Sequence, residues 1–571
     1  MKINLRNAKF GIVAGFLIMI GCFLYFWYVV PYQVSFKEQI QLFVFAGSYI
    51  GTYFLKPAAL ACLSGDFLTQ FLYFKGAGAA VITLLLSTEW LLIYFILKRF
   101  SVHSWFAASW AFLPLMFDWI LFPDIAYYLS FSVSFIFVLL IFFFYSKISG
   151  KTSVFTGIIL IPVLYYITGV SVFLFLILVI LYDIHNERKR IIYWATILGL
   201  SLVIPLLFRH SFLLTFKLAY IYPYQNIKYG LSLMVLIIVV LLAVIAQKYF
   251  PIKSEGKKIY AAINFIVMVS ILIVALVKTM EQKQENLFGL STEAWHEQWD
   301  KVLDIAEKTE IQNPVAAHYI NLALSHKNLL GERLMDFYQP FSSGLFLPTF
   351  PSYSWFELFS SNEAYYHIGD MDLAQHGAMV GLLCSPRQRS VRLVERLAEI
   401  NLAINDIPAA TKYLRMLDAT LFHKMKEERM KNTAYQAIFK EDMIRKTSDI
   451  KIPLELLVES NPEHLPAVNY LLCYYLLNKN IQAFFNAYTS YFKGKYNSVP
   501  KIYAEALLIY FAVKGSTVQE LMNYSIHPEI IKSFNEYTRI YEQSEAKLDS
   551  LLEKYKNTYW VFYHFAVLNQ E

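Results

Sequence analysis

Long apolar runs dominate the first half of the chain, and they limit what it can fold into. Each run holds about 20 predominantly apolar residues, which is the length that a helix needs to cross a bilayer. Within lipid, only helices and closed barrels satisfy every backbone polar group, so these runs predict membrane-spanning helices. The clear runs are residues 10–30, 76–97, 105–121, 125–145, 191–208, 229–247 and 260–277.

A further apolar run, residues 154–183, is too long for one span and short for two. Lys147 and Lys151 precede this run and the sequence ERKR (residues 187–190) follows it, so both of its ends carry basic residues. Because basic residues mark the cytoplasmic side, we predict that both ends face the same side. The run is then a hairpin of two spans that turns near residues 162–169, and the total is nine spans.

The distribution of Lys and Arg orients these spans. With the N-terminus in the cytoplasm, fourteen Lys and Arg residues fall in inner segments and seven in outer segments, which agrees with the positive-inside rule. We therefore predict a multi-pass protein of the bacterial inner (cytoplasmic) membrane, with a cytoplasmic N-terminus and an extracytoplasmic second half. The first run could also be a lipoprotein signal ending at Cys22, but the apolar sequence continues beyond it, which favours an uncleaved signal anchor.

Composition divides the chain into two domains. Charged residues make up 16% of the 571 residues, against roughly 25% in soluble domains. Residues 1–279 hold 21 Lys and Arg against 8 Asp and Glu, whereas residues 280–571 hold 29 against 35. This contrast predicts a transmembrane domain over 1–279 and a water-compatible domain over 280–571. We interpret the excess of Lys and Arg in the first half as a consequence of membrane topology. We therefore expect the lipid bilayer as a partner and no nucleic acid.

The second domain is predicted to be helical throughout, because its apolar residues recur every three or four positions and its Gly and Pro lie in the gaps. Residues 363–383, 397–417 and 461–492 resemble the helix–turn–helix units of tetratricopeptide repeats. The expected fold is therefore all-α, with a transmembrane bundle followed by a helical-repeat domain; a helical domain without repeats is the alternative. A repeat groove would bind a protein partner. Residues 339–359, with three prolines and several aromatics, are predicted to lie on a surface, either of the membrane or of the transmembrane domain.

No sequence motif predicts a metal or a cofactor. The chain has no HExxH or CxxC spacing for zinc and no GxxxxGK[ST] or GxGxxG loop for a nucleotide. Cys384 and Cys473 could pair in an oxidising compartment or stay as buried thiols.

The connection between the first two spans, residues 31–75, lies on the outer side and is far more apolar than a solvated loop. We predict helices that lie in or dip into the outer interface. The acids of this first outer loop are Glu38 and Asp66. Asp66 follows Gly65 and precedes the apolar sequence FLTQFLYF, so it is either the N-cap of an interfacial helix or part of a functional site.

Further charged residues are expected on the same outer face. Asp118 and Asp124 lie at the outer end of the third span, and Arg209 and His210 lie at the outer end of a later one. Together with Glu38 and Asp66, they converge on one predicted outer vestibule. Membrane anchoring through headgroups is the alternative role for the two basic residues.

The layout of many spans, an acidic helical first outer loop and a helical tail resembles the C-type superfamily of membrane glycosyltransferases. Residues 57–80 (PAALACLSGDFLTQFLYFKGAGAA) also resemble a block in uncharacterised bacterial multi-pass inner-membrane proteins with a similar helical tail. The glycosyltransferase resemblance implies a polyprenyl-phosphate-linked sugar donor and a catalytic acid in the first outer loop. Asp66 is then the first candidate for the general base and Glu38 the second, Arg209 and His210 would bind the donor phosphate, and Asp118 and Asp124 would contribute to substrate binding.

Glu89 differs from these residues because it lies near the middle of a predicted span. An ionisable residue at this depth is costly and usually has a function or a buried partner. A proton- or ion-coupled transporter is therefore an alternative function, and a non-enzymatic envelope scaffold that binds a partner through its tail is another.

Overall fold

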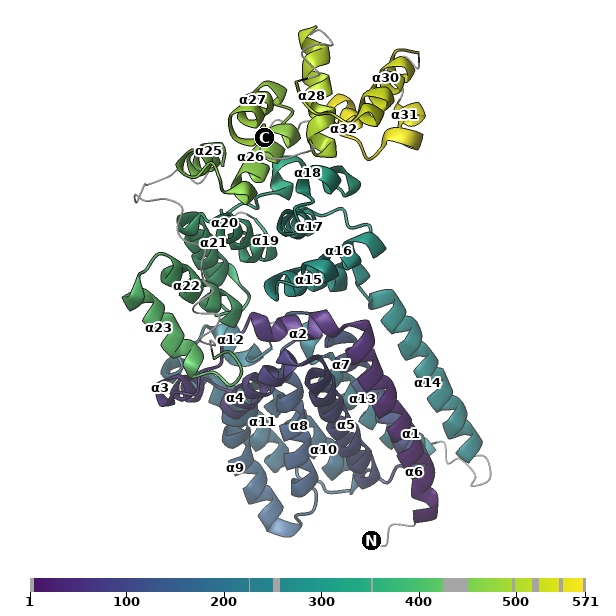
Figure 1. The fold of residues 1–571 in the computed structure, drawn as a ribbon. Coiled ribbons are helices and arrows are strands. Elements are labelled where there is room, and N and C mark those ends of the chain that lie inside the picture. Colours follow the sequence, from purple (N-terminus) through teal and green to yellow (C-terminus); the bar gives the residue numbers. More distant parts are fainter. Residues whose placement is uncertain are drawn as a thin grey trace. The chain divides into compact units, whose positions relative to one another are not determined.

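The computed structural model describes residues 5–224, 226–249, 257–350, 353–424, 450–494, 499–515, 523–543 and 548–567. Within these ranges every regular element is a helix and no strand occurs, so the protein is all-α as predicted (Figure 1). The chain divides into two compact units. The first unit is Met1–Gln282 together with Ala419–His423, and the second is Lys283–Asp418 together with Lys424–Glu571.

The first unit contains helices that are compatible with a membrane. Among its described residues, five helical segments are long and apolar enough to cross a bilayer, or six if a bent pair counts as one span. The nine-span prediction, which also counts α8 (Leu129–Tyr145) and α13 (Leu231–Tyr249), stays a prediction. The five segments are α5 (Lys75–Arg99), α6 with α7 (Ser104–Trp110, Phe112–Leu121), α9 with α10 (Gly150–Thr168, Val172–His185), α11 (Ile191–Ser211) and residues Ala262–Thr279 of α14 (Lys257–Thr279).

Helices α9 and α10 run antiparallel, as the contacts between the start of α9 and the end of α10 show. Between them lies Gly169, whose φ of +68° is readily adopted by glycine. Tyr182, near the end of α10, donates its hydroxyl to the carbonyl of Ser146, which precedes α9 (3.0 Å). Arg190, beyond α10, donates to the Ser153 hydroxyl (2.8 Å). The chain therefore reverses at Gly169, at the end of the region where the sequence placed a turn.

The first outer loop folds into short helices. After α1 (Leu5–Leu24) and η1 (Tyr25–Val29) the chain bends by 73° into α2 (Pro31–Gln39), which begins at a proline, a residue suited to the first position of a helix. Next come α3 (Gly47–Gly51), η2 (Thr52–Leu55), α4 (Ala59–Thr69) and η3 (Gln70–Tyr73). Helix α4 packs so closely on α8 that a Cβ atom at Gly65 would lie 2.3 Å from the backbone nitrogen of Ser130. This contact between backbones fixes the position of α4, which carries Asp66.

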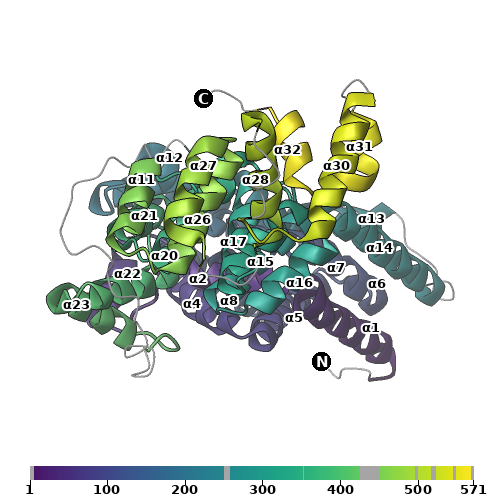
Figure 2. The ribbon, with the colours of Figure 1, turned by 45° about the horizontal axis from the view of Figure 1, so that its top comes forward.

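The second unit is built from helix pairs (Figures 1 and 2). The three predicted repeats are the pairs α20/α21, α22/α23 and α26/α27. Each pair is joined by a residue of positive φ followed by Asp or Asn, whose side chain accepts the backbone N–H three residues later. These joints are Gly369-Asp370, Asn405-Asp406 and Lys479-Asn480. The shared turn accounts for the pairing of the helices, and the likeness to tetratricopeptide repeats stays a prediction.

The α-helices described in the second unit are α15 (Gln282–Trp295), α16 (Trp299–Lys308), α17 (Pro314–His326), α18 (Leu330–Arg333), α19 (Trp355–Ser360), α20 (Asn362–Ile368), α21 (Met371–Cys384), α22 (Val391–Ala403), α23 (Ile407–Asp418), α25 (Lys451–Ser460), α26 (Leu465–Leu477), α27 (Ile481–Ala487), α28 (Lys501–Lys514), α30 (Pro528–Gln543), α31 (Leu548–Tyr555) and α32 (Tyr559–Phe565).

A buried ion-pair network holds α20 against α22. Glu363 accepts from Arg392 (2.8 Å) and from Arg396 (2.6 Å), and Arg396 also pairs with Glu399 (2.9 Å). Burial raises the pKa of the Glu363 carboxyl, but the two guanidinium groups outweigh it and hold that pKa below its ordinary value. Both guanidinium groups also lie over the Trp295 ring, at 4.9 and 4.8 Å from its centroid.

Part of the segment 339–359 lies in the core of the second unit. Leu345, Phe346 and Leu347 are buried, the Leu345 carbonyl lies 2.9 Å from Nδ1 of His318, and Phe346 stacks on Tyr365. The prediction that this segment lies on a membrane surface is therefore wrong for these residues. Leu345, Phe346 and Leu347 fill the protein interior, which apolar composition alone does not distinguish from a membrane.

Candidate functional site

Asp66 lies in the middle of α4 and is buried, with 5% of its surface exposed. Helix α4 begins at Ala59, so the interpretation of Asp66 as the N-cap of this helix is wrong. The Tyr53 hydroxyl donates to Oδ2 of Asp66 (2.7 Å), and Gln41 donates to its backbone carbonyl (2.9 Å). Burial, and then the Asp66 carboxylate, raise the pKa of Tyr53, so its phenol stays protonated as a donor. These contacts fix the Asp66 carboxylate within the first outer loop.

Glu38, on α2, is also buried and faces a residue that sequence reasoning missed. Its Oε1 lies 2.7 Å from Nε2 of His423. His423 belongs to the short segment Ala419–His423, which packs with the first unit although it lies far along the chain. Phe45 donates its N–H to the Ala419 carbonyl (2.7 Å), and Phe422 stacks on Tyr73. No local sequence pattern marks His423, because its contact with Glu38 joins positions that are 385 residues apart.

Lys37 contacts the backbone around Asp124, whereas the Asp124 carboxylate has other partners. Lys37 donates its Nζ to the carbonyls of Asp124 (2.7 Å) and Tyr127 (2.6 Å). The Asp124 carboxylate pairs with Lys228 (2.7 Å) and accepts from the Tyr229 hydroxyl (3.1 Å). Burial raises the pKa of Asp124, but the hydrogen bonds from Lys228 and from the backbone at residue 126 lower it below its ordinary value. Asp124 therefore ties the loop before α8 to the 3-10 turn Ile227–Gly230, which precedes α13.

The structure separates Asp118 from the other outer residues. Asp118 lies on α7 and is fully buried, next to Glu89 of α5, which is also fully buried. Asp118 thus meets Glu89, the acid that the sequence placed within a predicted span. The sequence indicated that Glu89 has a function or a buried partner, but it did not name Asp118 as that partner, because Asp118 was expected at the outer end of a span.

Arg209 and His210 lie at the end of α11. Arg209 donates through Nε to the Leu214 carbonyl (3.2 Å), and His210 is exposed. None of the contacts described for these two residues reaches Asp66 or Glu38. Their predicted role in phosphate binding stays a prediction.

An apolar groove of about 650 Å³ lies in the first unit between α10, α12 (Phe216–Ile221) and α13. Lys217 is the charged residue in its lining, and Tyr220, Tyr224 and Asn226 add polar atoms. Tyr222, which lies between the lining residues Ile221 and Tyr224 in the sequence, contacts the first outer loop, since its hydroxyl lies 3.8 Å from Sγ of Cys62 on α4. The other lining residues are Val170, Phe173, Leu174, Ile177, Ile221, Gly230, Leu233, Met234 and Ile237.

Metal-binding geometry does not occur among the described residues, where no three His, Cys, Asp or Glu side chains group around one point. All four cysteines are free thiols, so Cys384 and Cys473 do not pair.

The fold and these residues define an all-α protein whose first unit carries apolar helices compatible with a membrane and whose second unit is made of helix pairs. Over residues 6–566 the chain matches a family of unknown function (DUF6057), and it belongs to that family. It matches none of the curated proteins and none of the solved structures with which it was compared.

Proposed function

We propose that this protein is a glycosyltransferase of the bacterial inner membrane that takes a sugar from a polyprenyl-phosphate-linked donor at the outer face. The observation that supports this proposal best is the link between a buried acid and an apolar groove. Asp66 follows Cys62 by one helical turn, so the two residues share a face of α4. Cys62 contacts Tyr222, which lies within the segment that walls the groove.

The groove suits a lipid with an anionic headgroup. Its volume of about 650 Å³ falls within the range of ligand sites, and its apolar walls would bury part of an isoprenoid chain. Lys217 is exposed at the groove and can bind a phosphate as a compact point charge. Such a lipid would place its phosphate, and the sugar attached to it, at the polar end of the groove.

The proposed reaction is an inverting displacement at the anomeric carbon. Asp66 accepts the proton of the acceptor hydroxyl, the acceptor oxygen bonds to the anomeric carbon, and the bond from that carbon to the phosphate oxygen breaks. Polyprenyl phosphate or pyrophosphate leaves with the bonding electron pair, and Lys217 stabilises its negative charge. Tyr53 orients the Asp66 carboxylate, and Glu38 with His423 is the second candidate for the base.

Binding of the donor lipid tests the groove. The full chain, purified in detergent, is titrated with polyprenyl phosphate, and bound lipid is counted by native mass spectrometry. Loss of one charge-assisted contact costs about 1.5–3 kcal/mol, so Lys217→Ala should weaken binding about 10- to 100-fold. Lys56→Ala is the matched control, because Lys56 is exposed on the first outer loop and does not line the groove. Equal affinity of the Lys217→Ala variant and the wild type would contradict the proposed phosphate site.

A further inference from the structure

Glu89 and Asp118 bring two carboxyl groups together inside the apolar helices of the first unit. Glu89 lies within α5 and Asp118 near the end of α7, and neither side chain has any exposed surface. The two carboxyl groups are close enough to interact, yet within the described part of the chain none of their four oxygens has a hydrogen-bond partner of good geometry. A fully buried acid normally has such partners, so this arrangement needs an explanation.

Among the described residues, no Lys or Arg forms a salt bridge with either carboxyl group of the pair. Lys37 approaches Tyr127, a neighbour of Asp118, but donates to the Tyr127 carbonyl (2.6 Å), with its Nζ 5.8 Å from the centre of the Tyr127 ring. Two ionised carboxylates in contact repel each other, and the cost rises in a medium of low dielectric constant.

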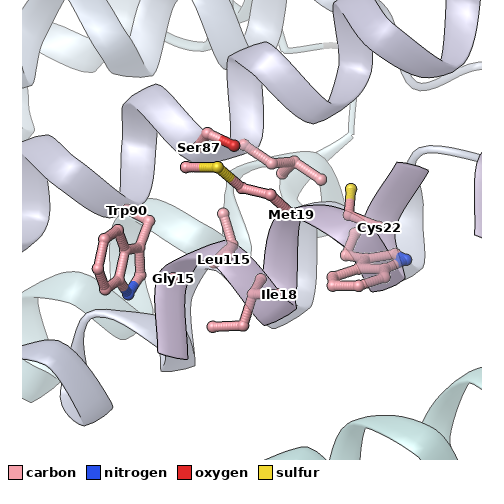
Figure 3. A pocket seen from close by; sticks show the side chains of 9 residues that line it. Gly15, Ile18, Met19, Cys22, Ser87, Trp90 and Leu115 are labelled. Carbon is pink, nitrogen blue, oxygen red and sulfur yellow. The ribbon is translucent and has the colours of Figure 1, made fainter. Parts of the chain in front are cut away.

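On the side of α1, a buried water cannot stabilise the negative charge of the two carboxyl groups. Helices α1, α5 and α7 enclose a small cavity (Figure 3). Ser87 and Trp90, which line it, lie on either side of Glu89 in the sequence. The volume of the cavity is about 10 Å³ and its exposed lining is apolar. A buried water needs at least this much space and two or more polar partners, so the cavity is unsuited to one.

The remaining neighbours of the pair are neutral groups that can exchange hydrogen bonds. Ser132 lies beside Glu89, and Tyr127 and Ser232 lie beside Asp118. Tyr127 and Ser132 are themselves 3.1 Å apart. Among the described residues, Cys22 of α1 lies within electrostatic range of Glu89, and Tyr224 at the wall of the groove lies within range of both acids.

We propose that Glu89 and Asp118 form a proton-binding pair within the membrane, in which at least one carboxyl group is protonated and donates to the other. A proton turns one acid into a donor, so that contact between the acids becomes a hydrogen bond instead of a repulsion. Because this bond exists only while α5 and α7 are in contact, proton binding is linked to the approach of these two helices. The proposal is independent of glycosyl transfer.

Carbodiimide modification tests the pair directly. Dicyclohexylcarbodiimide reacts with protonated carboxyl groups in apolar surroundings, and peptide mass spectrometry identifies the modified residue. In the wild-type full chain at neutral pH, we expect modification at Glu89 or Asp118. Asp183 is the matched internal control: it is equally buried, but Arg188 and Arg190 lie at 3.7 and 4.0 Å, and it should stay unmodified.

Infrared spectroscopy supplies a second readout. The band of a protonated carboxylic acid should be present in the wild type and reduced in Glu89→Gln and in Asp118→Asn, which preserve side-chain shape. Absence of both the band and the modification in the wild type would overturn the proposal. Suppression of the modification by sodium chloride, but not by choline chloride, would also overturn it, because the pair would then hold a metal cation instead of a proton.

Discussion

The contact between α4 and α8 gives the sharpest mechanical prediction. In Gly65→Ala the new Cβ atom would lie 2.3 Å from the Ser130 nitrogen and 2.4 Å from its Cα. Non-bonded atoms of this kind prefer about 3.5 Å, so α4 has to move by about 1 Å. Backbone atoms cannot rotate away, which places the cost at the upper end of the overpacking range, about 3 kcal/mol. Alanine regains about 1 kcal/mol of helix propensity, and the net loss of unfolding free energy is about 2 kcal/mol.

Thermal unfolding of the full chain in detergent measures this loss. Gly76→Ala is the matched control, because nothing lies within 4 Å of its added Cβ and the helix propensity should slightly stabilise α5. The shift of α4 also moves Asp66, and a displacement of about 1 Å at a reacting group can cost about 100-fold in rate. If Gly65→Ala melts no lower than Gly76→Ala, then the packing of α4 on α8 is not as described and the placement of Asp66 loses its support.

Three further predictions concern buried polar groups. Glu363→Gln removes the carboxylate between Arg392 and Arg396 and should lower the unfolding free energy of the full chain by about 3–5 kcal/mol; a loss below about 1 kcal/mol would contradict the network. Burial raises the pKa of Glu505 from 4.5 to about 7, so the folded protein binds this proton more tightly than the unfolded chain. That stability, at most about 3 kcal/mol, is present below about pH 4.5 and is lost as the pH rises through about 7. Glu505→Gln should remove this part of the pH dependence of melting, and an unchanged pH profile would refute the assignment. His423→Ala leaves Glu38 buried without its imidazole partner and should cost about 1–3 kcal/mol and expose Ala419–His423 to protease, whereas unchanged cleavage would show that this contact does not hold the segment.

Helix content and pairing could be predicted from the sequence because they depend on local patterns. Apolar runs between basic residues mark the helices of the first unit, and the turn at Asp370 carries its own signal, a glycine followed by a capping acid. The reversal at Gly169 lies within the apolar run 154–183, where a turn was predicted because the run is too long for one span. The number of spans does not follow in the same way, because α8 has 17 residues, which is at the lower end of the lengths that cross a bilayer, so packing decides its role.

The site could be predicted only in part, because its key contacts join distant positions. Glu38 and Asp66 were found as isolated acids in an apolar loop, but neither Tyr53 nor His423 has a local signature of its role. Asp118 was expected at the outer surface, because hydropathy cannot show that α7 turns its acid toward α5. Such pairings depend on helix rotation, which the sequence pattern of an almost wholly apolar helix leaves undetermined.

The transfer reaction itself tests the central proposal most directly. Full-length protein in detergent is incubated with radiolabelled hexose on polyprenyl phosphate or pyrophosphate and with membrane extract from cells that lack the protein as the source of acceptor. We expect transfer of label by the wild type and a rate at least about 100-fold lower for Asp66→Asn, whose amide oxygen can still accept the Tyr53 hydrogen bond but cannot act as a base. A folded Asp66→Asn variant with the wild-type rate would exclude Asp66 as the base. A wild type that transfers no label but copurifies with a stable protein partner would contradict the enzyme and favour an envelope scaffold.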